Sequence, residues 1–140
     1  MAVKVTIKNE AEAKEKIRRV VRHAYESVRS LANRHVTVGI KEGARYPNGK
    51  YVRDVAAFVE YGTFRMPPRP YMRACRAENK GKWHNQLRRE LRLVIKGEQT
   101  ADQALQKVGA TMLADIRGMI EYYDAIDTGR LRDSYEIQIT

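Results

Sequence analysis

Four carboxylates near the C-terminus are the residues whose types and spacing come nearest to catalytic chemistry. They are Glu121, Asp124, Asp127 and Asp133. Paired carboxylates can act as general acid and general base, or they can hold a divalent metal. No second motif completes an active site around them, and the run from Asp127 to Gly129 has the pattern of a helix cap followed by a turn. We therefore interpret these carboxylates as capping and surface groups. A metal-dependent hydrolase that uses Glu121, Asp124 and Asp127 is the alternative.

Cys75, the single cysteine, is a second candidate for chemistry because Arg73 and Arg76 stand near it in the sequence. Nearby cations lower the pKa of a thiol. A nucleophilic cysteine also needs a paired base, and no motif supplies one, so we predict that Cys75 is a small apolar residue on a helix. A single cysteine excludes an internal disulfide and a multi-cysteine zinc site.

The three histidines are separated in the sequence, and no carboxylate motif accompanies them, so we predict no metal site. They are His23, His35 and His84. The sequence has no glycine-rich phosphate-binding loop either. These observations predict a protein without catalytic residues, cofactor or metal, and therefore not an enzyme.

Composition predicts a single domain that spans residues 1–140. The chain is 43% hydrophobic, so it can bury a core. No apolar run approaches the ~20 residues that a membrane helix needs, and the first residues lack the apolar region of a signal peptide. We therefore expect a soluble protein that is made in the cytosol and has no membrane partner.

The chain is strongly basic, because 27 Lys and Arg stand against 17 Asp and Glu and give a net charge of +10. Such a charge favours contact with nucleic acid, anionic lipid or an acidic protein surface. It is equally compatible with a soluble protein whose surface is rich in arginine. The basic residues form no compact tail, which weakens the case for a dedicated DNA-binding arm.

The most distinctive segment runs from Val55 to Arg73 and contains Pro67, Pro68 and Pro70. Proline fixes its own φ angle and biases the preceding residue toward extended geometry. We therefore predict a stiff, extended connector from Met66 to Pro70, whose shape suits a docking edge.

Six side chains around this connector are candidates for a subunit interface. Three are apolar anchors of the kind that interfaces bury, and three are arginines that can clamp acidic groups of a neighbouring subunit by bidentate pairing. In the alternative interpretation, the apolar side chains fold back onto their own domain and the arginines are solvated charge. The six are Phe64, Met66 and Tyr71, with Arg65, Arg69 and Arg73.

The first half of the chain has clear hydrophobic periodicity. Alternation over residues 3–7 indicates a short strand or extended arm. Apolar residues at spacings of three and four predict a long amphipathic helix over about residues 10–33, and Asn9 with Glu12 forms a variant capping box before it. Alternation then predicts a half-buried strand over residues 36–40.

The middle of the chain begins with turn-forming residues. Asn48 and Gly49 tolerate positive φ, so we predict a mobile loop or hairpin tip at about residues 41–51. A short helix follows from Val52, and Gly62 is its expected stop.

Two further long helices are predicted from periodicity and capping signals. The first starts near Pro70, which suits a first helical turn, and ends at Gly97. Thr100 and Gln103 form a capping box for the second, whose apolar face continues to Tyr123.

The C-terminal part contains a turn-rich break over residues 124–129, one helical turn over 130–133 and an alternating strand over 135–139. We expect this strand to pair with the strand at 36–40. The predicted fold class is α+β: a small antiparallel sheet packed against the long N-terminal helix and two further long helices. A sheet this small has free edges that another subunit could cover.

Two motifs give the chain a resemblance to a known family. The first is Phe58-Val-Glu-Tyr-Gly-Thr63 followed by Met66-Pro-Pro-Arg-Pro-Tyr-Met-Arg73, and the second is Asp127-Thr-Gly-Arg-Leu-Arg-Asp-Ser134. They resemble, in matching order, the "EFGT…MPARPFLRPA" and "DTGRLRDS" segments of phage tail-component proteins. These are the minor tail or head–tail joining proteins of long-tailed phages. A family of phage virion-morphogenesis proteins shares the proline-rich part. This chain departs from the pattern at Ala74-Cys75, where family members more often have Pro-Ala.

The resemblance implies a structural virion-assembly protein without catalytic activity or cofactor: a tail-completion or head–tail joining subunit of a phage or prophage. Its expected partners are copies of itself in a ring around the DNA channel, and neighbouring connector or tail-tube proteins. Its expected location is the bacterial host cytoplasm during assembly, and then the virion tail or neck. Lys41, Arg45 and Lys50 become candidates for non-specific contact with genomic DNA. The alternative is a basic nucleic-acid-binding module without catalytic activity.

Overall fold

The computed structural model describes residues 9–125 and 129–140. The predicted strand at 3–7 and the predicted cap at Asp127 lie outside these residues. In chain order the elements are α1 (Glu10–Leu31), β1 (Val36–Ile40), α2 (Val52–Tyr61), α3 (Tyr71–Ile95), α4 (Ala101–Tyr122), α5 (Arg130–Asp133) and β2 (Tyr135–Ile139). The predicted α+β class, with a small antiparallel sheet and three long helices, is confirmed.

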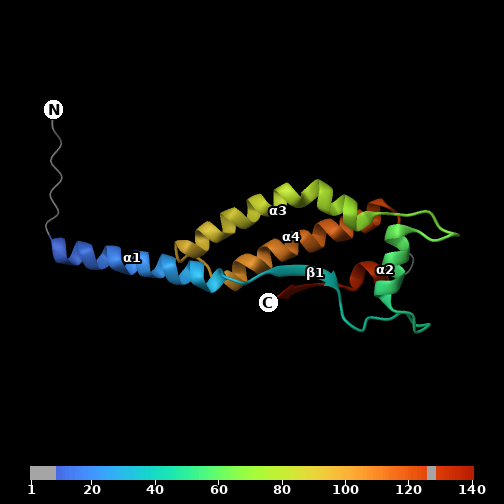
Figure 1. Ribbon diagram of the computed structural model, residues 1–140, viewed down its shortest axis with the longest axis horizontal. Coiled ribbons are helices and arrows are strands. Elements are labelled where there is room, and N and C mark those ends of the chain that lie inside the picture. Colours follow the sequence, from blue (N-terminus) through green and yellow to red (C-terminus); the bar gives the residue numbers. More distant parts are fainter. Residues whose placement is uncertain (1–8, 126–128) are drawn as a thin grey trace, which may run out of the picture.

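The molecule is elongated: α1 projects from one end and α2 lies at the other (Figure 1). Between them, α3 and α4 pack side by side as an antiparallel pair. The predicted capping box starts α4, because the Thr100 hydroxyl accepts a hydrogen bond from Gln103 N (3.2 Å) and Gln103 Oε1 accepts one from Thr100 N (3.0 Å). A short, capped connection of this kind turns the chain back along α3.

The two strands pair antiparallel, with Val36 opposite Ile139 and Ile40 opposite Tyr135. Their apolar residues share one face, as the alternation in both strands requires. This face lies on α4, where Gly109 permits a very close approach. A Cβ atom at Gly109 would lie only 2.6 Å from a methyl carbon of Ile137, so a larger residue would push the sheet away.

The hydrophobic core is concentrated toward the α2 end of the molecule. Its largest fully buried side chains are Tyr71, Ile120, Val52 and Cys75. Burial raises the pKa of the Cys75 thiol, so the cysteine is a core residue, as predicted, and not an activated nucleophile. Among the described residues, no helix combines the length and the apolar character that crossing a membrane requires.

Two tyrosines join α3 to β2 inside this core. The hydroxyl oxygens of Tyr71 and Tyr135 lie 2.7 Å apart, and the rings meet edge to face with centroids separated by 6.3 Å. Burial raises the pKa of both phenols, that of Tyr135 to about 12. Each hydroxyl is therefore neutral and hydrogen-bonded to the other within the core.

Tyr71→Phe should lower the free energy of unfolding by about 1–3 kcal/mol, because the Tyr135 hydroxyl would stay buried without its partner. The double variant Tyr71→Phe with Tyr135→Phe should cost less than the sum of the two single variants, since neither hydroxyl then remains. Urea unfolding of the four proteins gives the double-mutant cycle. Strictly additive losses would show that the two hydroxyls do not stabilise each other.

Candidate subunit interface

The loop between α2 and α3, residues 62–70, contains the predicted connector Met66–Pro70 and folds back on α2. Thr63 N donates to Met66 O (2.8 Å) and Met66 N donates to Thr63 O (3.2 Å), which closes a tight turn. After the prolines, Arg69 N donates to Val59 O at 2.7 Å. The whole loop is therefore compact: its tip is the turn from Thr63 to Met66, just before the predicted connector, and Arg69 in the connector ties it to the end of α2.

Glu60 caps the N-terminus of α3 from the neighbouring helix. Its carboxylate accepts hydrogen bonds from Met72 N (2.9 Å), Arg73 N (3.1 Å) and Arg73 Nε (2.8 Å). The residue is only 6% exposed, and α3 receives no side-chain cap from Pro70, its own N-cap residue. The carboxylate thus satisfies two free backbone donors and lies at the positive end of the helix dipole.

Gly62 makes the return of the connector possible. It follows α2 with a φ of +76°, in the region that favours glycine, and its N–H donates to Phe58 O. A Cβ atom at this position would lie 2.8 Å from Pro68 N and 2.9 Å from Met66 O, both of them backbone atoms. The predicted helix stop is confirmed, and the glycine also lets the loop pack directly against the helix end.

Four of the six predicted interface residues make contacts within their own chain. Tyr71 is 1% exposed, so its interface prediction is corrected: an aromatic residue on the inner face of α3 is core. Met66 packs against the core, and Arg69 Nη1 donates to Asp124 O at 2.7 Å. Arg73 binds Glu60, although its side chain is 58% exposed. The structure favours the alternative interpretation for these side chains, in which they stabilise their own domain.

Phe64 and Arg65 do lie on the surface, at the tip of the loop. Phe64 is completely exposed, and Phe58 (52%) and Tyr61 (69%) on α2 are also open to solvent. We name Phe58, Tyr61 and Phe64 the aromatic tip. The three side chains belong to the end of α2 and the loop that follows it, and exposed large apolar side chains are candidates for contact with a partner.

A second exposed apolar surface lies on α1. Its members are 55–66% exposed and follow one face of the helix at spacings of three and four; they are Ile17, Val20, Val21, Tyr25 and Val28, which we name the α1 stripe. The sequence predicted this amphipathic helix, but periodicity alone could not tell that its apolar face is exposed in the part of the chain that the structure describes. The α1 stripe and the aromatic tip lie at opposite ends of the molecule (Figure 1).

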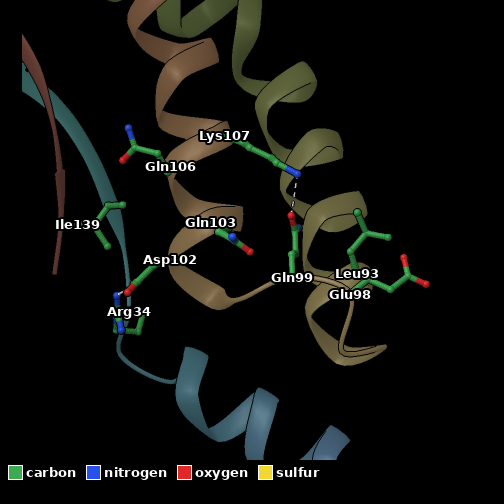
Figure 2. Close-up of a pocket in the computed structure, with 9 residues that line it drawn as sticks. All are labelled: Arg34, Leu93, Glu98, Gln99, Asp102, Gln103, Gln106, Lys107 and Ile139. Carbon is green, nitrogen blue, oxygen red and sulfur yellow. Dashed lines mark hydrogen bonds and ion pairs between the residues drawn. The ribbon is translucent and has the colours of Figure 1, made fainter.

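The base of α1 is joined to the body beside a polar groove with a volume of about 910 Å³. Figure 2 shows Arg34, just after α1, paired with Asp102 on α4. On the other side of the groove, Lys107 Nζ donates to Gln99 Oε1 (2.8 Å), and Gln99 Nε2 donates to Glu90 Oε2 (2.6 Å). These groups pair with one another and join the link after α1 to α4, and α4 to α3, so we interpret the groove as a structural junction.

The predicted DNA-contact residues lie on the hairpin between β1 and α2. Tyr46 N donates to Lys50 O (2.9 Å) and Gly49 N donates to Tyr46 O (2.9 Å), which forms its tip. Arg45 stacks over the Tyr51 ring at 3.8 Å, while Lys41 and Lys50 are exposed. The hairpin-tip alternative is confirmed, and the mobility of residues 41–51 stays a prediction.

The C-terminal carboxylates form local ion pairs. Arg132 binds Glu121 and Asp133, each at 3.1 Å, and Asp124 is a surface residue whose carbonyl accepts the bond from Arg69. Over residues 9–125 and 129–140, no group of three His, Cys, Asp or Glu side chains is arranged to hold a metal ion. The carboxylates of Glu121 and Asp133 therefore serve as structural partners of Arg132.

No protein-family profile, curated protein or solved structure matches this chain.

Glu60→Gln should lower the free energy of unfolding by about 1.5–3 kcal/mol, because the carboxylate loses charge-assisted hydrogen bonds and interaction with the helix dipole. Chemical denaturation measures the loss. Glu78→Gln, at an exposed position of α3, is the matched control and should change stability by less than about 0.5 kcal/mol. Equal effects of the two substitutions would rule out a special role for Glu60.

Gly62→Ala should destabilise the protein by more than about 1 kcal/mol, because its positive φ and the backbone atoms around it leave no room for a methyl group. Gly81→Ala should instead stabilise it by about 0.5–1 kcal/mol, because Gly81 lies inside α3 with open space around it. Thermal unfolding of both variants tests the pair. Stabilisation by both would show that the loop does not pack against α2 as described.

Proposed function

We propose that this chain is a structural assembly subunit whose copies join head to tail into a ring, as a tail-completion or head–tail joining protein of a phage or prophage. The observation that carries the proposal is the pair of exposed apolar surfaces at opposite ends of the molecule, the α1 stripe and the aromatic tip. Two different surfaces that meet between successive copies make a heterologous contact, which closes into a ring when the rotation allows.

A second copy of the chain is the occupant that suits both surfaces. The α1 stripe is bordered on one side by basic residues one helical turn apart, Lys14, Arg18 and Arg22. The aromatic tip offers ring faces, to which guanidinium groups bind favourably. This chain already uses that contact, because the Arg73 guanidinium lies 4.9 Å from the centroid of the Tyr61 ring.

The energy of this contact favours reversible association of single copies and firm association only in a closed ring. Complete burial of an apolar side chain contributes ~2 kcal/mol, and about three-fifths of each α1 stripe side chain is still exposed, which gives ~6 kcal/mol for the five. Fixing one subunit relative to another costs ~4–15 kcal/mol. A ring in which every copy makes two contacts would therefore be far more stable than an open pair.

The resemblance of the proline-rich and C-terminal motifs supports the phage role, and the net charge of +10 suits a ring through which DNA passes. The adjoining partners would be connector or tail-tube proteins, in the bacterial host cytoplasm during assembly and later in the virion tail or neck. The same charge favours a second candidate function, a basic nucleic-acid-binding module without catalytic activity. Such a module would bind DNA without self-association.

Val21→Glu should disable the α1 stripe and Phe64→Glu the aromatic tip, so each variant alone should sediment as a monomer where the unmodified chain associates. A mixture of the two should form a heterodimer at high concentration and no larger species, because the intact tip of the first can meet the intact stripe of the second through one reversible contact. Sedimentation velocity measures all three samples.

Arg19→Glu, on the opposite face of α1, is the control and should associate like the unmodified chain. An unmodified chain that stays monomeric at every concentration, or single variants that associate as well as the unmodified chain, would overturn head-to-tail assembly. DNA binding by such a monomer would then favour the second candidate function.

A further inference from the structure

We propose that one row of basic side chains on α3 binds the phosphate backbone of duplex DNA. The row has a basic residue or a histidine at every fourth position and is exposed throughout; it comprises Arg76, Lys80, His84, Arg88, Arg92 and Lys96, which we name the α3 ridge. Residues four apart are neighbours on a helix surface. Each step of four also turns the row by about 40° around the helix axis, so the row winds along α3 and its two ends point to different sides. At 1.5 Å per residue, the α3 ridge therefore extends for about 30 Å.

The arginines and lysines of the α3 ridge are left without acidic partners. Within the described residues, none of the five forms an ion pair or a side-chain hydrogen bond. The α3 cations that are paired lie elsewhere on the helix: Arg73 binds Glu60 and Lys82 binds Asp115. The positive charge of the α3 ridge is thus available to an external anion.

Helix stability alone does not account for this row. Like charges at i and i+4 destabilise a helix, and the α3 ridge repeats that spacing along most of α3. The helix dipole favours cations only in the last turn, which explains Arg92 and Lys96 but not Arg76, Lys80 or Arg88. Repulsion between these neighbours is relieved when a polyanion binds along the whole row.

Duplex DNA fits the full length of the α3 ridge better than an amphipathic partner does. An apolar groove with a volume of about 460 Å³ borders the first half, where Arg76, Lys80 and His84 adjoin side chains such as Trp83 and Met112. A lipid or an acidic amphipathic helix would use that half alone. Duplex DNA needs no apolar contact and presents one charge per ~1.7 Å of its axis, so its phosphates can meet long side chains from both halves of the row as it winds along α3.

The residues that the sequence predicts for DNA contact, Lys41, Arg45 and Lys50, lie on the hairpin between β1 and α2. Their surroundings suit DNA binding less well than those of the α3 ridge. Arg45 donates to Gly49 O (3.1 Å) and stacks on Tyr51, which leaves Lys41 and Lys50 as separate charges at a loop. The place of DNA inside a ring rests on the proposed function. The contact itself can be measured on single copies, so failure of DNA binding and failure of assembly are distinguishable.

The test is fluorescence anisotropy with two labelled DNA duplexes of unrelated sequence, each longer than the ~9 base pairs that the α3 ridge can span. Both should bind equally. Replacing Arg76, Lys80, Arg88 and Arg92 together by Gln should reduce the slope of log affinity against log salt by about 3–4, which is roughly a 10²-fold smaller loss of affinity between ~50 and ~200 mM salt.

The matched control replaces four exposed cations near α2, namely Lys41, Lys50, Arg53 and Arg65, by Gln and should keep most of the slope. The half-ridge variants, Arg76/Lys80→Gln and Arg88/Arg92→Gln, should each lower it by about 2. Circular dichroism establishes that every variant is folded. No binding by the unmodified chain, a larger loss in the control, or an effect confined to Arg76/Lys80 with preference for anionic vesicles would overturn the proposal.

Discussion

The bonds that the Glu60 carboxylate makes at the start of α3 are the constraint on which the rest of the fold depends. α3 begins after a proline, which donates no hydrogen bond and caps nothing. A buried acid from α2 supplies the cap, so the end of one helix fixes the start of the next. α3 then carries Tyr71 and Cys75 into the core and packs along α4, so this carboxylate lies at the start of the helix that contributes both residues to the core.

The loop between Glu60 and the start of α3 also determines which side chains are exposed at this end of the molecule. Gly62 and the Thr63–Met66 turn hold the loop in one shape, and that shape leaves the Phe64 ring wholly in solvent. A rigid loop binds a partner with little loss of conformational entropy, because its backbone is already ordered. The proline-rich motif, one of the two that resemble phage tail components, thus mainly joins α2 to α3 in this chain. The exposed side chains of the aromatic tip are the part of it that a partner could contact.

Local features of this fold could be predicted from the sequence because local spacing causes them. The helix predicted over 10–33 is Glu10–Leu31, both described strands occupy the predicted residues, and Thr100 caps α4 as expected. Contacts between residues far apart in the sequence could not be predicted, because spacing and capping patterns report only on neighbouring residues. Tyr71 reads equally well as an anchor for a partner or as core, and only its meeting with Tyr135, far along the chain, decides between them.

The candidate site shows the same division. The amphipathic pattern of α1 could be predicted, but whether anything covers its apolar face depends on where the whole helix points. Glu60 lies in a recognisable motif, yet its role follows from a bond to Arg73 across a loop. The α3 ridge was not predicted, because basic residues that are four positions apart become neighbours only once the helix forms. Arg76 then lies beside Lys80, and Arg88 lies beside Arg92.

A three-residue link, Ala32 to Arg34, connects α1 to the two-stranded sheet. The pairing of the strands begins at His35, whose N–H donates to Thr140 O. The ion pair of Arg34 with Asp102 at this joint is open to solvent on the Asp102 side, where the side chain is 69% exposed, and ion pairs near the surface add little stability. A small change in the angle at this joint moves the far end of a ~33 Å helix by several ångströms. In a closed assembly, that angle would set the curvature from one copy to the next, so a few residues at the foot of α1 would govern how many copies complete the circle.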